Sequence, residues 1–194
     1  NGNLFIRTMA LMFTFAFVTA QGARLGGLVL AANAILMNIQ LLTSMALDGF
    51  AHAAEALVGK AIGQKNRNAL QYSVRLSLKW SLIFAVGFCL LYLLFGPLLI
   101  RTLTDLDDVR DTAMRFLPWL VLSPLVSVWS FLYDGVYVGA TRAREMRNIM
   151  LFSSLAVFLP AWFLLQGYGN HGLWLAFTLF MASRGLGMHL GYRR

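Results

Sequence analysis

Six stretches of apolar residues, separated by short polar segments, divide this chain of 194 residues. A helix needs about 20 apolar residues to cross the hydrocarbon core of a bilayer, and these stretches are of that order. Backbone polar groups in hydrocarbon must be satisfied within the segment, so the stretches are predicted to be α-helices. The sequence therefore predicts an all-α integral membrane protein. Its six transmembrane helices are expected at approximately residues 4–21, 28–58, 74–100, 114–140, 148–166 and 172–192.

Polar and helix-breaking residues mark the expected ends of these helices. Gly96 and Pro97 are expected to end the third span, because proline cannot continue the helical hydrogen-bond ladder. Residues 59–68 and the acidic residues 104–111 are expected to be solvated loops. Residues 167–172, rich in glycine, are expected to form a tight turn between the last two spans.

Lys and Arg gather after the second and fourth spans and at the C-terminus. The other connections carry a single Arg, an acidic patch or no full charge. Loops rich in Lys and Arg stay in the cytoplasm, so both ends of this chain are expected to be cytoplasmic.

The composition supports a membrane protein and argues against several other classes. Hydrophobic residues make up 59% of the chain and charged residues 12%, about half the share of charge in a soluble domain. The net charge of +8 does not indicate nucleic-acid binding, because no continuous basic stripe with aromatics lies outside the spans. Cys89 is the single cysteine and has no partner for an internal disulfide. The chain shows no phosphate-binding loop, nucleophile elbow or metal motif, so we expect neither an enzyme nor a bound cofactor or metal.

The second span carries polar side chains at separations of seven, four, four, four and three residues. At this spacing they share one helix face, which is expected to point at a bundle interior or an aqueous cavity. A charged side chain at the bilayer centre costs about 3 kcal/mol even on lenient scales, so it persists mainly where it faces protein or water. The members of this stripe are Asn33, Gln40, Ser44, Asp48, His52 and Glu55.

Three members of the stripe also have purely structural interpretations. Glu55 is close enough in sequence to pair with Lys60 or to lie among the headgroups. Asp48 is followed by Gly49, which leaves room for close packing and structural hydrogen bonds. His52 fits a satisfied interior histidine as well as a proton carrier.

The fourth span repeats the pattern around one acidic residue. Asp134 is the only fully charged residue between Arg115 and Arg142. Pro118 and Pro124 each remove a backbone donor, so this helix is expected to be bent, and bent helices often line transport sites. The stripe consists of Ser123, Ser127, Ser130, Asp134, Tyr137, Thr141 and Glu145.

Arg7 and Arg184 also fall inside apolar stretches. Each lies near the expected cytoplasmic boundary, so its long side chain is expected to extend outward to the headgroups in a structural role.

Several motifs together resemble the multidrug and toxic compound extrusion (MATE) family. They lie at residues 22–26 (GARLG), 30–36 (LAANAIL), 47–51 (LDGFA), 53–63 (AAEALVGKAIG), 134–136 (DGV) and 139–142 (GATR). The segment LVGKAIG is the most specific of them, and residues 48–51 with 54–55 resemble the DNA-damage-inducible branch of the family.

The resemblance implies a fold of twelve helices in two lobes, of which this chain looks like the C-terminal six-helix lobe. It implies a bacterial inner-membrane antiporter that exports amphipathic, cationic compounds in exchange for H⁺ or Na⁺. It also implies that Asp134 binds the coupling cation. The polar stripes of the second and fourth spans are expected to line the substrate cavity. The first span lacks the acid found in sodium-coupled members, which favours H⁺. The chain begins without Met, and the N-terminal lobe of a longer protein is its expected partner, besides the lipid bilayer.

Two alternatives remain open on the sequence. A flippase for lipid-linked substrates has a related architecture and should line its cavity with several cations, whereas these spans offer mainly carboxylates and neutral groups. A non-transporting membrane subunit would use the polar stripes as contacts between helices.

Overall fold

The computed structural model describes residues 1–194, nearly all of which are helical. Five helical segments are long and apolar enough to cross a membrane, and α7 is a further helix of 23 residues. The predicted all-helical architecture with six long helices is confirmed, with the fifth assembled from three pieces. The elements are α1 (Gly2–Arg24), α2 (Gly27–Gly63), α3 (Arg67–Leu103), α4 (Asp107–Gly139), α5 (Ala143–Phe152), the π-helical η1 (Ser153–Phe158), α6 (Leu159–Leu165), the 3-10 turn η2 (Gln166–Tyr168) and α7 (Asn170–Tyr192).

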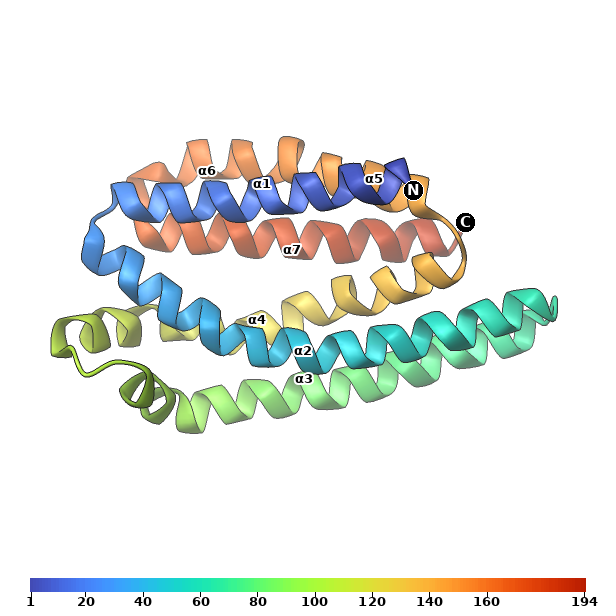
Figure 1. Ribbon diagram of the computed structural model, residues 1–194, viewed down its shortest axis with the longest axis horizontal. Coiled ribbons are helices and arrows are strands. Elements are labelled where there is room, and N and C mark those ends of the chain that lie inside the picture. Colours follow the sequence, from blue (N-terminus) through green and yellow to red (C-terminus); the bar gives the residue numbers. More distant parts are fainter.

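The helices form two groups that meet along α4 (Figure 1). In one group α1, α5, α6 and α7 lie side by side, and in the other α2 and α3 pack against α4. Because α4 also packs against α7, it belongs to the boundary between the two groups. Side chains of α4 can therefore contact residues of both groups of helices.

Two connections are shorter than the polar segments predicted. Residues 59–63 continue α2, and only residues 64–66 form the turn before α3. Asn66 caps α3 by accepting a hydrogen bond from the Ala69 backbone N–H at 3.0 Å. Hydropathy marks the part of a helix that fits in hydrocarbon, whereas the backbone ladder continues until a cap or turn stops it. The prediction of a loop over residues 59–68 is therefore wrong for most of its length.

Gly96 and Pro97 do not end the third helix, which continues to Leu103. Proline removes one ladder hydrogen bond, and packing compensates for that loss here. A Cβ at Gly96 would lie 2.8 Å from Cδ1 of Leu117 on α4, so the glycine allows α3 to approach α4 closely. This prediction was wrong because contacts between helices override local propensity.

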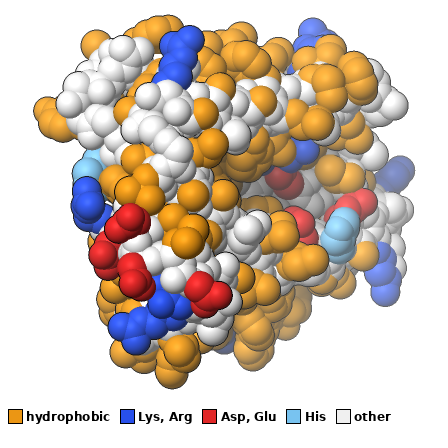
Figure 2. All heavy atoms as spheres, turned by 60° about the vertical axis from the view of Figure 1, so that its left-hand side comes forward, with side chains coloured by type: hydrophobic (Ala, Val, Ile, Leu, Met, Phe, Trp, Pro, Cys, Tyr) orange, Lys and Arg blue, Asp and Glu red, His pale blue; other side chains and the backbone are white.

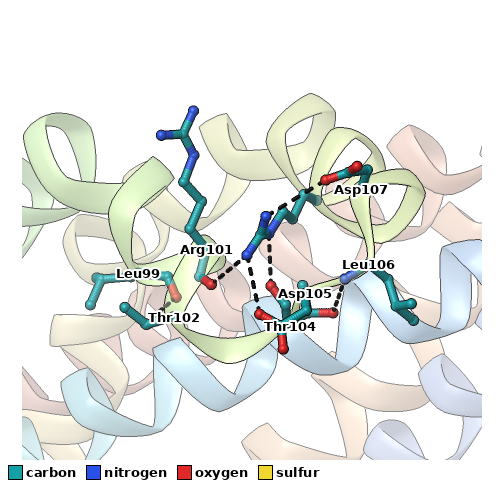
Figure 3. A network of polar contacts seen from close by, with 8 residues as sticks. Leu99, Arg101, Thr102, Thr104, Asp105, Leu106 and Asp107 are labelled. Atoms are coloured by element: carbon teal, nitrogen blue, oxygen red, sulfur yellow. Dashed lines mark hydrogen bonds and ion pairs between the residues drawn. The ribbon is translucent and has the colours of Figure 1, made fainter.

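The turn between α3 and α4 is built around Arg110 (Figure 3). Its Nε donates to the carbonyl oxygen of Thr104 at 2.7 Å, and its Nη2 donates to that of Arg101 at 3.0 Å. Asp105 and Asp107 lie 3.5 and 3.6 Å from the same guanidinium. The guanidinium thus satisfies carbonyls at the end of α3. Of the predicted acidic loop, only residues 104–106 are non-helical.

The fifth span changes from an α-helix to a π-helix at Ser153–Phe158 and back to an α-helix at Leu159. Pro160, near the start of α6, has no backbone N–H, which is a recognised cause of such interruptions. Ser154 is fully buried there and its hydroxyl lies 2.8 Å from that of Thr14 on α1. No pattern in the sequence predicts this interruption.

Two glycines allow α4 to cross α2 with the backbones in contact. A Cβ at Gly135 would overlap the carbonyl oxygen of Ala51, and one at Gly139 would lie 2.5 Å from that of Glu55. Small residues of this kind are typical of contacts between transmembrane helices.

Replacement of Gly135 by Ala is expected to separate α2 from α4 and lower the free energy of unfolding. Overpacking costs typically about 1–3 kcal/mol, and a clash with backbone lies at the upper end because backbone cannot rotate away. Thermal unfolding of the purified protein in detergent measures the effect. Gly87→Ala is the matched control, since a Cβ at Gly87 meets no atom within 4 Å. Equal melting temperatures for the two variants would contradict the proposed contact.

Candidate functional site

The carboxylate of Asp134 on α4 lies between two guanidiniums that come from other helices. Nη2 of Arg7 on α1 donates to Asp134 Oδ2 at 2.5 Å. Nη2 of Arg184 on α7 donates to the same oxygen at 2.9 Å. A single carboxylate oxygen therefore joins α1, α4 and α7, and we call these three residues the ion cluster.

Burial makes the ion cluster energetically significant. Arg184 is 4% exposed, and the side chains of Arg7 and Asp134 are 16% and 20% exposed. Nη1 of Arg184 also donates to Met181 Sδ at 3.4 Å, and its guanidinium lies 5.6 Å from the ring centre of Phe180. A buried guanidinium is tolerated only where it is paired, and Asp134 provides the counter-charge.

The predicted outward extension of Arg7 and Arg184 is wrong. Both side chains turn toward Asp134 instead of toward the headgroups. The sequence placed both arginines correctly inside apolar stretches. It contained no sign that a carboxylate 127 residues from Arg7 and 50 residues from Arg184 would receive them.

Neighbouring residues on α4 hold α7 in the position that the ion cluster needs. The hydroxyl of Ser130 donates to the Met181 carbonyl at 2.8 Å, and that of Tyr137 donates to the Met188 carbonyl at 2.6 Å. Ser130, Asp134 and Tyr137 are spaced by four and three residues, so all three face α7. Three of the seven residues of the polar stripe predicted on the fourth span thus contact α7, whereas Thr141 and Glu145 lie beyond the end of α4 at Gly139.

The acidic end of the α2 stripe lies near the ion cluster. Asp48 is exposed, within electrostatic reach of Asp134, Arg7 and His52. Figure 2 shows acidic, basic and histidine side chains in and around a recess of the surface. Glu55 lies 3.6 Å from Nδ1 of His52, whereas no ion pair joins it to Lys60.

A cavity of about 360 Å³ opens between α1, α2, α4 and α7. Gln40 and Ser44 of the predicted stripe line it, together with the aromatic rings of Phe15, Phe131 and Phe177. The side-chain oxygen of Gln40 is buried and has no hydrogen-bond partner. The cavity therefore combines apolar and aromatic walls with a free acceptor, which is the usual character of a small-molecule site.

Asn33 also lines the cavity, but its amide is fully engaged in a contact between α2 and α7. Asn33 and Asn170 exchange two hydrogen bonds at 2.9 and 2.8 Å, and Trp174 Nε1 donates to Asn33 Oδ1 at 3.0 Å. The sequence analysis did not single out Asn170 or Trp174. Asn170 lies in the turn expected over residues 167–172, whereas the structure begins α7 at this residue.

The remaining predicted residues lie outside the lining of this cavity. Ser127 bonds to the Ser123 carbonyl of its own helix at 2.7 Å, while Ser130 and Tyr137 lie in the contact with α7. No group of three or more His, Cys, Asp or Glu side chains lies close enough to hold a metal ion.

The MatE family model matches residues 4–163, which is most of the chain. The chain belongs to the MatE family. It is 42% identical to DNA damage-inducible protein F of Escherichia coli over all 194 residues. It is 28% identical to a probable multidrug resistance protein NorM of Brucella suis over 96% of the chain. This MatE chain spans 42% of the length of each of these two relatives.

Solved structures of MOP superfamily transporters share the fold. A MOP superfamily transporter from Pyrococcus furiosus matches 98% of the chain with a TM-score of 0.87 at 18% identity, over 42% of its own length. The outward-facing and inward-facing conformations of a multidrug resistance MATE family transporter match with TM-scores of 0.78 and 0.82, at 18% and 17% identity. Each match covers 97% of this chain and 43% or 45% of the other. The six helices therefore correspond to less than half of a MatE transporter.

Replacement of Asp134 by Asn is expected to destabilise this MatE chain strongly. It leaves the buried Arg184 without a counter-charge, and breaking a buried pair from one side costs about 3–5 kcal/mol. Asp48→Asn is the matched control, because Asp48 is exposed and takes part in no ion pair. Thermal unfolding in detergent compares the two. A loss of stability that is no larger for Asp134→Asn than for Asp48→Asn would show that the ion cluster does not stabilise the fold.

Proposed function

We propose that this chain is the C-terminal lobe of a secondary antiporter that exports amphipathic, cationic small molecules. The N-terminal lobe of the same protein would be its partner, and both ends of the chain would be cytoplasmic in a bacterial inner membrane. The observation that carries the proposal is the buried ion cluster beside an open, aromatic cavity. Membership of the MatE family supports it, as do relatives that are named as multidrug resistance proteins.

Asp134 is the proposed coupling residue. Its ion pairs with Arg7 and Arg184 would link its protonation to the packing of the helices. A proton on Asp134 removes the single counter-charge that two guanidiniums share. The contact between α4, α1 and α7 then weakens, and a state in which the helices separate becomes more favourable. Coupling of this kind operates through the different affinities of two conformations for the same ion.

A proton fits the ion cluster better than Na⁺. Sodium needs several oxygen ligands, whereas α1 presents Arg7, a cation, to the only carboxylate in the cluster. Asp48, His52 and Glu55 offer further protonatable groups near the ion cluster. They would pass protons between water and Asp134, while Gln40 and Ser44 contact the substrate.

A second candidate is favoured by the same two arginines. A carrier of substrates with a phosphate or carboxylate, such as a flippase for lipid-linked compounds, needs cations at its site. The sequence predicts that Arg7 and Arg184 extend to the headgroups, yet both reach the ion cluster. Preference for an anionic over a cationic substrate distinguishes this candidate from the first.

Efflux by the full-length protein in vesicles tests the proposal. A fluorescent organic cation is expected to move under an imposed pH gradient, and Asp134→Asn is expected to abolish the dependence on that gradient. The same assay under a Na⁺ gradient separates the two coupling ions. Thermal unfolding of each variant at the assay temperature distinguishes loss of coupling from loss of folded protein.

Three outcomes change the conclusion. Full transport by Asp134→Asn under a pH gradient would reject the coupling role of Asp134. Transport driven by Na⁺ alone would reject the proton. Movement of an anionic probe with no movement of the cation would favour the second candidate.

The cavity lining has a separate test. Ala34 lines the cavity and is exposed, so Ala34→Phe is expected to fill part of its volume and reduce transport about tenfold or more, with little effect on stability. Ala20→Phe on α1 is the control, because Ala20 is exposed and lies outside the lining. Equal transport by both variants would exclude the cavity from the substrate path.

A further inference from the structure

A second pocket, of about 520 Å³, lies where the start of α3 meets the end of α7. Residues of α3, Tyr133 of α4 and the last residues of the chain form its walls. It is separate from the ion cluster and from the cavity described above. Its lining consists of Arg67, Leu70, Gln71, Val74, Arg75, Leu78, Tyr133, His189, Tyr192, Arg193 and Arg194.

The pocket carries four arginines and no acidic residue. Elsewhere in the chain Arg7, Arg110, Arg142 and Arg184 are paired with carboxylates, whereas five arginines are not. The four arginines of this pocket make no ion pair and no side-chain hydrogen bond. Their positive charges are therefore gathered without a counter-charge from the protein.

Guanidinium groups suit one ligand chemistry in particular. Their planar array of N–H donors matches the oxygens of a phosphate, with two parallel hydrogen bonds from each group. The hydroxyl of Tyr133 lies 2.5 Å from Nδ1 of His189, which fixes the imidazole at the wall of the pocket. Four guanidiniums and one imidazole thus surround a space that has no anion of its own.

The other wall of the pocket is apolar. Leu70, Val74 and Leu78 follow one another at four-residue spacing along α3, so they form a single strip. A ligand held by its phosphate at the arginines would have this apolar strip beside it.

The position in the fold agrees with the interface of a membrane. Arg67 is the first residue of α3, and Arg193 directly follows α7. The apolar part of each helix begins beyond these arginines, so they lie at headgroup depth. Basic pockets between transmembrane helices at this level are typical binding sites for anionic lipid headgroups.

We propose that this pocket binds the phosphodiester of an anionic phospholipid, with its acyl chains along Leu70, Val74 and Leu78. A bound lipid would bridge α3 and α7, which belong to different groups of helices. The proposal does not depend on what the protein transports, or in which direction.

Lipid binding to the purified full-length protein in detergent, followed by native mass spectrometry, tests this proposal. The probes are phosphatidylglycerol and phosphatidylcholine with identical short acyl chains, and inorganic phosphate. Phosphatidylglycerol is expected to bind at least about tenfold more tightly than phosphatidylcholine, because only the former carries a net negative charge. The double variant Arg67→Gln/Arg75→Gln is expected to lose most of that preference.

Arg24→Gln/Arg101→Gln is the matched control. Both of these arginines are exposed and lie outside the pocket, so their replacement removes the same charge from the surface. The control is expected to keep the preference for phosphatidylglycerol within about twofold, since screened surface charges act only locally. Because all four positions are exposed, both double variants are expected to fold, which thermal unfolding checks.

Three results would overturn the proposal. Equal loss in the two double variants would mean general surface attraction, and equal affinity for the two lipids would remove the role of the charge. Inorganic phosphate binding as tightly as phosphatidylglycerol would reject the lipid and leave a soluble phosphate as the ligand.

Discussion

Asp134 is the one acidic group that can neutralise Arg184, and much of the structure follows from that constraint. Arg184 is almost fully buried, and an unpaired charge at such a position would be prohibitively costly. The carboxylate must therefore stay beside α7, and the hydrogen bonds of Ser130 and Tyr137 to α7 keep it there. Arg7 adds α1 to the same arrangement. Any movement that separates these helices has to provide another partner for two guanidiniums.

The second group of helices is held by a different kind of contact. Gly135 and Gly139 bring the backbones of α4 and α2 together, and no charge is involved. One face of α4 thus makes ionic and hydrogen-bonded contacts with α7, while another makes close van der Waals contacts with α2. The first kind responds to protons and ions, and the second does not. A lobe built in this way can change one contact while it preserves the other.

The sequence predicted the class of fold well, because apolar stretches and polar stripes repeat with the period of a helix. It predicted helix ends less well. Pro97 predicts the end of a helix, but packing of Gly96 against Leu117 favours continuation of α3. For the site, the periodicity identified Asp134, Gln40 and Ser44 as inward-facing residues. The partners of Asp134 lie 127 and 50 residues away, and no local pattern reports which distant side chains meet in the folded chain.

The same limit applies to Asn33. Its place on the stripe was evident, whereas its engagement by Asn170 depends on how α2 and α7 pack. The role of the α4 stripe is a related case. Helical spacing shows that Ser130 and Tyr137 share a face, but a face turned toward water and one turned toward another helix have the same spacing. Only the hydrogen bonds to α7 distinguish them.

The π-helical segment at Ser153–Phe158 has a consequence for how this family of chains can vary. A π segment accommodates one additional residue within an otherwise continuous helix. Loss of one residue there would restore regular α-helix and leave the residues beyond it in nearly the same phase, because the wider π turn absorbs the extra residue. Loss of one residue elsewhere in the span would instead rotate everything that follows by about 100°, and Trp162, now buried in the core, would turn away from it. Insertions and deletions in this span are therefore constrained by the phase of the helix and not by its length, and an alignment that treats the segment as an ordinary helix would misplace the residues beyond it.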